Sequence, residues 1–153
     1  MVKKVAFIGL GVMGYPMAGH LISKNNSLSI KVYNRSIKKS ENWISKFKGS
    51  LCNTPAEAAK DSEIVFICVG NDKDVEEVVK GKNGIMSSIS ENSIIVDHTT
   101  ASAKIALNLY EFCSSKNVSF VDAPVSGGQA GAENGQLTIM VGGDESAYSK
   151  IEP

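Results

Sequence analysis

The chain has 153 residues, 42% of them hydrophobic, and its 16 basic and 16 acidic side chains cancel to a formal net charge of zero. This length predicts one domain with a core of its own, and the balanced charge gives no support for a nucleic-acid partner or an anionic membrane surface. No apolar run approaches the ~18 residues that cross a membrane, so we expect neither nucleic acid nor membrane as a partner.

Strand and helix patterns alternate along the first half of the chain. Short apolar or alternating runs predict strands at Lys4–Ile8, Leu28–Tyr33, Ser50–Cys52 and Ile64–Val69. Apolar residues at helical spacing, with start signals such as Thr54-Pro55-Ala56-Glu57, predict helices at Met13–Lys24, from Ser36 to about Phe47, and from Thr54 onward. The run at residues 64–69 is apolar throughout, as expected of a strand that is buried on both faces.

The alternation continues through the second half. Helices are predicted at Asp72–Lys80, at Ser102–Ser115 and from about Glu145, and strands at Ser93–Val96, Val118–Val121 and Gln136–Val141. The segment that holds Gly127, Gly128, Gly131 and Gly135 is interpreted as a Gly-rich loop. Together these elements predict an α/β fold of the Rossmann type: a doubly wound, mainly parallel sheet in a single three-layer domain.

A glycine motif joins the first strand to the first helix. Its residues are Gly9-Leu10-Gly11-Val12-Met13-Gly14, which is the G-x-G-x-x-G pattern in the strand–helix context that indicates dinucleotide binding. Gly9 allows the tight turn out of the strand, Gly11 lets a pyrophosphate approach the backbone, and Gly14 lets the helix pack close to the sheet. The N–H groups and the positive dipole end of the helix then face the phosphates.

The end of the second strand indicates which dinucleotide fits. It reads Asn34-Arg35-Ser36, without the carboxylate that usually binds the ribose 2′-hydroxyl of NAD. Arg35 can bind a 2′-phosphate, and Asn34 and Ser36 can donate hydrogen bonds, so NADP is favoured and NAD is the alternative. The neighbouring pair Lys38-Lys39 is interpreted as solvated helix residues.

Small and polar residues also follow the later strands. Val69-Gly70-Asn71 follows the fourth strand, and Gly70 permits close approach of a ligand. His98 is interpreted as a solvated loop histidine, whereas Thr99 and Thr100 are explained equally well as helix caps or as cofactor contacts.

A second distinctive segment, Asp122-Ala123-Pro124-Val125-Ser126-Gly127-Gly128, follows the sixth strand. The hydroxyl of Ser126 and the bare N–H groups of the two glycines suit a small carboxylate or phosphate. His98 is the only nearby base for Ser126, and no G-x-S-x-G elbow is present, which disfavours a hydrolase.

These motifs, extended by Gly131 to Gly143, resemble the β-hydroxyacid dehydrogenases, in particular the group of 3-hydroxyisobutyrate dehydrogenase and tartronate semialdehyde reductase. The resemblance covers essentially all 153 residues. It implies a Rossmann domain that binds NAD(P), a small hydroxyacid substrate, a separate all-helical C-terminal domain and a homo-oligomeric full-length protein. It assigns the pyrophosphate to Gly9 through Gly14, the adenosine side to Asn34, Arg35, Val69, Gly70, Asn71 and Val75, the nicotinamide ribose to Thr100, and the substrate carboxylate to Ser126, Gly127 and Gly128.

One part of the family pattern has no counterpart. The catalytic lysine of the family lies on a helix beyond the Gly-Gly-Asp turn, and no residue up to Pro153 matches it. We therefore expect a truncated chain that binds cofactor and turns over poorly or not at all. The alternatives are a non-catalytic nucleotide-binding scaffold of the same fold and, less favoured, a relative of 6-phosphogluconate dehydrogenase or imine reductase.

The number and spacing of the cysteines indicate the cellular compartment of the protein. Cys52, Cys68 and Cys113 are odd in number and form no CxxC pair. This pattern favours a reduced, intracellular compartment, so a cytoplasmic protein without a metal site is predicted.

Overall fold

Six parallel strands form the central sheet in the order β3-β2-β1-β4-β5-β6. The computed structural model describes all of residues 1–153, and the strands are β1 (Lys4–Ile8), β2 (Ser29–Tyr33), β3 (Ser50–Leu51), β4 (Ile64–Ile67), β5 (Ile94–Asp97) and β6 (Ser119–Asp122). Every neighbouring pair runs parallel. The chain builds outward from β1 in one direction and from β4 in the other, which confirms the predicted doubly wound Rossmann sheet.

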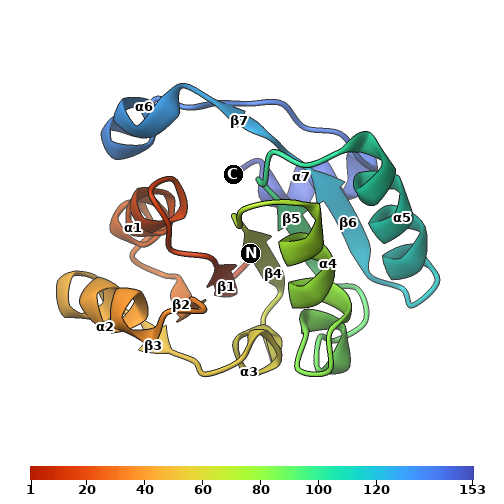
Figure 1. Cartoon of the computed structure of the whole chain (residues 1–153), viewed down its shortest axis with the longest axis horizontal. Coiled ribbons are helices and arrows are strands. Elements are labelled where there is room, and N and C mark those ends of the chain that lie inside the picture. The colour runs from red at the N-terminus through yellow and green to blue at the C-terminus, as the bar shows by residue number, and fades with distance from the viewer.

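Helices cover both faces of this sheet (Figure 1). They are α1 (Gly14–Lys24), α2 (Ile37–Lys46), α3 (Pro55–Ala59), α4 (Asp72–Lys80), the 3₁₀ turn η1 (Ile85–Ser87), α5 (Ala103–Ser114), α6 (Gly128–Asn134) and α7 (Glu145–Ile151). None of these helices has both the length and the apolar character that crossing a membrane requires.

Alternating strand side chains divide the interior into two clusters, one on each face of the sheet. Ile8 and its neighbours pack with residues of α3, α4 and α5, including Leu109. Phe7 and its neighbours pack with residues of α1, α2 and α7, including the fully buried Trp43. The two-residue period of the strands thus produces three layers, as predicted.

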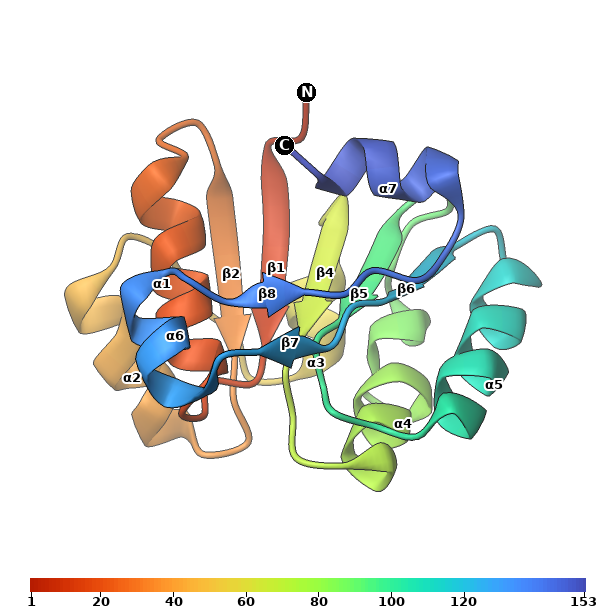
Figure 2. The ribbon, with the colours of Figure 1, turned by 90° about the horizontal axis from the view of Figure 1, so that it is seen from above.

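The segment after β6 differs from the prediction. The supposed Gly-rich loop contains α6, and the predicted strand at residues 136–141 shrinks to β8 (Thr138–Ile139), which pairs antiparallel with β7 (Val125–Ser126) outside the main sheet. Figure 2 shows β7 and β8 crossing in front of the sheet toward α6, which lies beside α1.

Tertiary contacts and glycine geometry explain this difference. The Nε2 atom of His20 on α1 lies 2.9 Å from the carbonyl oxygen of Glu133 on α6. Gly127 (φ 136°) begins the helix, and Gly135 (φ 65°) ends it in a left-handed conformation. Glycine content alone predicts a loop, whereas here the glycines form the ends of a short helix docked on α1.

Candidate cofactor-binding site

The glycine loop between β1 and α1 has the backbone geometry that its motif predicts. Gly9 has φ 99°, and an added Cβ would lie 2.1 Å from the carbonyl oxygen of Cys68. At Gly14 a Cβ would lie 2.1 Å from the carbonyl oxygen of Gly9 and 3.2 Å from the ring of Phe7. Side chains are therefore excluded at both positions, by the neighbouring strand end and by the turn itself.

Gly11 differs from the other two glycines. Apart from Gly11 itself and its two chain neighbours, no atom lies within 4 Å of the point that its Cβ would occupy, and its φ is not in the left-handed region. The backbone N–H groups of residues 11 to 14 donate to no acceptor in the chain. Four free donors at the N-terminus of an 11-residue helix, next to open space, fit the phosphates of a dinucleotide.

The loop after β2 is joined to the glycine loop through Asn34. Its side-chain oxygen accepts a hydrogen bond of 2.8 Å from the N–H of Leu10, and its amide nitrogen donates one of 3.1 Å to the carbonyl oxygen of Ser36. Both polar atoms of the Asn34 side chain thus bind backbone groups. In this structure Asn34 holds the glycine loop against the end of β2, and the Leu10 side chain is buried.

Arg35 lies beside Asn34 with its guanidinium in solvent. Its side chain is 89% exposed, and Nη1 lies 3.7 Å from Oδ1 of Asp74 at the start of α4. Ser36 is exposed and precedes α2 without a side-chain capping bond, and Lys38 and Lys39 are exposed on α2, as predicted. An exposed cation thus lies at the end of β2, and Asp74 is its ion-pair partner within the chain.

The loops after β4 and β5 are also connected. Gly70, Asn71 and Thr100 are exposed, whereas Thr99 is buried and its Oγ1 accepts a hydrogen bond of 3.0 Å from the N–H of Val69. The side chain of Asn71 caps α4 by accepting from the N–H of Asp74 at 3.0 Å. Three exposed predicted residues therefore line the rim at the carboxyl ends of these strands.

One sequence interpretation is wrong here, that of His98, and Val75 is buried as well. Val75, which the resemblance assigns to the adenosine side, is 0% exposed and packs in the core under α4, because it lies on the apolar face of that helix. His98, expected in solvent, is 6% exposed and stacks on the ring of Phe66, with Nδ1 2.8 Å from the carbonyl oxygen of Ala123. Burial lowers the pKa of His98, which keeps the ring neutral.

The sequence patterns did not point to two acidic residues at this edge of the sheet, Asp97 and Asp74. Asp97 is buried at the end of β5, and burial raises the pKa of its carboxyl group to about 6. Its position as the last residue of an apolar strand was the available signal. Asp74 contacts Arg35 from a different element, and only the fold brings them together.

Ser126, Gly127 and Gly128 are exposed on β7 and at the start of α6. Gly127 and Gly128 both have positive φ angles, 136° and 66°. His98 binds Ala123, three residues before Ser126, so it anchors the start of this segment, and no hydrogen bond joins it to the serine hydroxyl. Across the chain, no group of three or more His, Cys, Asp and Glu side chains is arranged to hold a metal ion.

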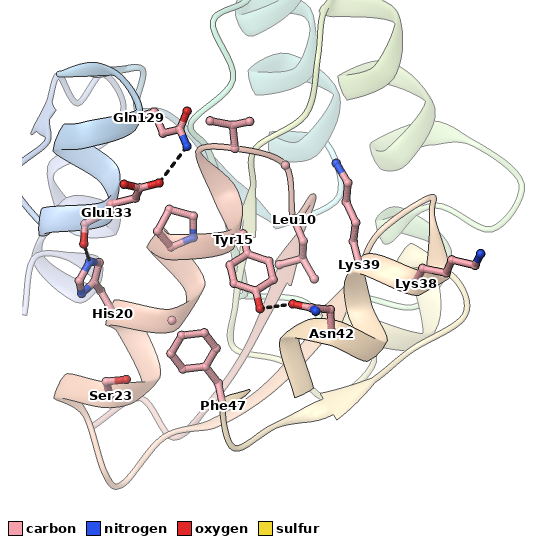
Figure 3. A pocket seen from close by; sticks show the side chains of 14 residues that line it. Leu10, Tyr15, His20, Ser23, Lys38, Lys39, Asn42, Phe47, Gln129 and Glu133 are labelled. Atoms are coloured by element: carbon pink, nitrogen blue, oxygen red, sulfur yellow. Dashed lines mark hydrogen bonds between the residues drawn. The ribbon is translucent and has the colours of Figure 1, made fainter. Parts of the chain in front are cut away.

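A cavity lies beside this rim. It measures about 760 Å³ and is bounded by α1, α2 and α6 (Figure 3). Only Leu10, Gly11 and Val12 of the predicted site reach it, and the hydroxyl of Tyr15 donates to the side-chain oxygen of Asn42 across it at 2.5 Å. The cavity is therefore a groove along the outer side of α1, next to the glycine loop, and the strand ends lie outside it.

Comparisons with known proteins agree with this geometry. Residues 4–153 match the family model described as the NAD binding domain of 6-phosphogluconate dehydrogenase. An uncharacterized oxidoreductase of Shewanella frigidimarina is 50% identical over 98% of this chain and 51% of its own length. The chain thus spans about half the length of the curated relatives it matches.

Solved structures show the same architecture. The 3-hydroxyisobutyrate dehydrogenase of Mycobacterium tuberculosis, solved with L-serine, superposes with a TM-score of 0.91 at 25% identity, over all of this chain and 50% of that one. Psf3 in complex with NADP+ and 2-OPP superposes with a TM-score of 0.89 at 27% identity, over 97% of this chain and 52% of that one.

Proposed function

This chain belongs to the family of NAD-binding domains of 6-phosphogluconate dehydrogenase, with 3-hydroxyisobutyrate dehydrogenase-like relatives, and from that premise we propose that it is the NADP(H)-binding domain of a 3-hydroxyacid dehydrogenase. The substrate would be a small 3-hydroxyacid or its semialdehyde. The observation that carries the proposal is the glycine loop: the N–H groups of residues 11 to 14 donate to no acceptor in the chain, Gly11 borders open space, and the exposed Arg35 follows Asn34, which binds the loop.

Each part of the rim has a task in this proposal. The N–H groups of residues 11 to 14 bind the pyrophosphate, and Arg35 binds the 2′-phosphate, with Ser36 beside it. Val69, Gly70 and Asn71 lie along the adenosine, and Thr100 contacts the nicotinamide ribose. Ser126, Gly127 and Gly128 bind the substrate carboxylate. The bound nicotinamide supplies or accepts the hydride.

Residues 1–153 form the cofactor-binding domain in this proposal. The lysine to which the resemblance assigns proton transfer at the substrate oxygen matches no residue among the 153. We expect the 153-residue chain to bind NADPH without oxidising 3-hydroxyacids. Turnover of 3-hydroxyisobutyrate by this chain alone would contradict that division of tasks.

The glycine loop offers the sharpest test. Gly11→Ala adds a methyl group in open space, so the melting temperature should stay within about 2 °C of wild type. The same methyl group occupies the approach to the pyrophosphate, so NADPH binding, followed by its fluorescence, should weaken at least about tenfold. Unchanged NADPH binding by a folded Gly11→Ala variant would remove the loop from the site.

Arg35→Ala tests the choice of cofactor. It removes a charge-assisted pair with the 2′-phosphate, so NADPH binding should weaken by roughly 1.5–3 kcal/mol while NADH binding changes little. Wild-type protein that binds neither NADPH nor NADH would overturn the proposed function. Tighter binding of NADH than of NADPH by wild type would overturn only the preference for NADP.

A further inference from the structure

Two buried polar side chains, those of Asp97 and Thr99, lie at and just after the end of β5. Asp97 is 1% exposed and Thr99 is 2% exposed, although both lie at the carboxyl edge of the sheet where the proposed site is located. Neither side chain reaches solvent, so neither is a surface contact for a ligand. Their hydrogen bonds are directed instead at the backbone of the loops that form the rim.

Thr99 joins two of those loops through its side chain. The regular ladder between β4 and β5 ends where the N–H of His98 donates to the carbonyl oxygen of Ile67 at 2.8 Å. Beyond that point, the N–H of Val69 donates to Oγ1 of Thr99 at 3.0 Å. The hydroxyl thus adds one connection after the backbone ladder has ended, at the first residue of the segment Val69–Asn71.

The hydroxyl is itself held in place. The N–H of Thr99 donates to Oδ1 of Asp97 at 2.9 Å, in a bond that spans two residues. The carbonyl oxygen of Asp97 accepts from the N–H of Ala123 at 2.8 Å, so the turn is anchored to β6 on its other side. The position of Val69 is therefore linked through Thr99 and Asp97 to Ala123, by hydrogen bonds at the carboxyl edge of the sheet.

We propose that Thr99 is a positioning residue for the adenosine side of the cofactor, acting by fixing the backbone of Val69–Asn71. This inference rests on the proposed function, because it assigns that segment to the adenosine. Without the hydroxyl, the N–H of Val69 loses its acceptor, and the segment is free to leave the conformation that meets the ligand. A pre-ordered loop binds more tightly because less ordering is required on binding.

The test compares Thr99→Val, which keeps the shape and removes the hydroxyl, with Thr99→Ser, which keeps it. NADPH and 2′,5′-ADP are titrated by calorimetry against the 153-residue chain, and thermal unfolding is followed in parallel. Ser62→Ala is the matched control: Ser62 is buried, and its Oγ donates to the carbonyl oxygen of Ala58 at 2.8 Å, before the start of β4 at the opposite edge of the sheet.

We expect Thr99→Val to weaken NADPH and 2′,5′-ADP by the same factor, roughly tenfold, and Thr99→Ser to restore binding to within about threefold of wild type. Ser62→Ala should lower the melting temperature and leave both dissociation constants unchanged.

Wild-type affinity in Thr99→Val, or a loss confined to NADPH, would overturn the inference. If Ser62→Ala weakened the binding of both ligands as much as Thr99→Val does, the loss would follow from lower stability, and this result would also overturn the inference. Failure of the wild type to bind NADPH or NADH would instead overturn the proposed function.

Discussion

Asp97 places a carboxyl group in the interior, where burial raises its pKa from 3.8 to about 6 against the opposing effect of its hydrogen bonds with Thr99. The repulsion of Asp122 and Asp72 raises the pKa further. The folded chain therefore binds a proton at Asp97 more tightly than the unfolded chain does. The contribution to stability is complete below about pH 4 and is lost as the pH rises through about 6.

Asp97→Asn tests this pH dependence. Between pH 4.5 and 7.5 the free energy of unfolding of wild type should fall, relative to that of the variant, by about 2 kcal/mol. Urea unfolding of both proteins at the two pH values measures it. The comparison with the variant is needed because His98 also contributes to the pH dependence. Burial lowers the pKa of His98, so its contribution to stability is lost as the pH falls, which opposes the effect of Asp97. A difference that is constant with pH would contradict the prediction.

Asp74 competes for the cation at the end of β2. Its Oδ1 atom lies 3.7 Å from Nη1 of Arg35, and as an anion it disfavours a 2′-phosphate at the same guanidinium. We expect Asp74→Asn to tighten NADPH binding roughly two- to fivefold, with little effect on NADH binding. The matched control is Glu76→Gln, the same charge change on an exposed position of α4. Weaker NADPH binding in Asp74→Asn would show that Asp74 instead orients Arg35 for the ligand.

At the scale of elements, α3 shows how a five-residue helix is held by its first turn. Oγ1 of Thr54 accepts from the N–H of Glu57 at 3.0 Å, and the carboxylate of Glu57 accepts from the N–H of Asn53 at 2.8 Å. Pro55 occupies the first helical position, where its missing N–H costs little. The start signal Thr-Pro-Ala-Glu is therefore confirmed in its details.

Thr54→Ala should lower the free energy of unfolding by about 1 kcal/mol, because the N–H of Glu57 loses its cap. Urea unfolding measures the change, and NADPH binding should stay as in wild type. Ser36→Ala is the control, since Ser36 precedes α2 without a capping bond and its loss should change stability by less than ~0.5 kcal/mol. Equal losses in both variants would contradict the argument from the cap.

At the scale of the whole molecule, one sheet is shared by both hydrophobic clusters, so neither can form without it. The single tryptophan, Trp43, is fully buried on one face, and its indole N–H donates to the carbonyl oxygen of Tyr15 at 3.2 Å. Its fluorescence reports on that face, whereas circular dichroism reports on all helices. Both signals should follow one unfolding transition.

The prediction is that urea midpoints from Trp43 fluorescence and from far-ultraviolet circular dichroism coincide. Saturating NADPH should shift both by the same amount, as expected of a ligand that binds only the folded chain. Two separated midpoints would mean that the two faces unfold independently.

The sequence by itself determined the strands, most helices and the glycine loop. A short run that is apolar throughout, such as Ile64–Ile67, predicts a strand that is covered on both faces of the sheet. Gly9 and Gly14 were predictable because the spacing of the glycine motif implies a tight turn and close packing, and in the structure an added Cβ would lie 2.1 Å from a carbonyl oxygen at either position. These are properties of consecutive residues, and a sequence displays them directly.

Only the tertiary structure decided which polar residues face a ligand and which are buried. His98 and Thr99 follow a strand, as surface residues often do, yet they are buried and bind Ala123 and Val69, which follow β6 and β4. Val75 turned inward with the apolar face of α4, and α6 formed from a glycine-rich stretch because α1 holds it. Burial and pairing depend on what distant segments bring to a position, and that information is not contained in any short run of residues.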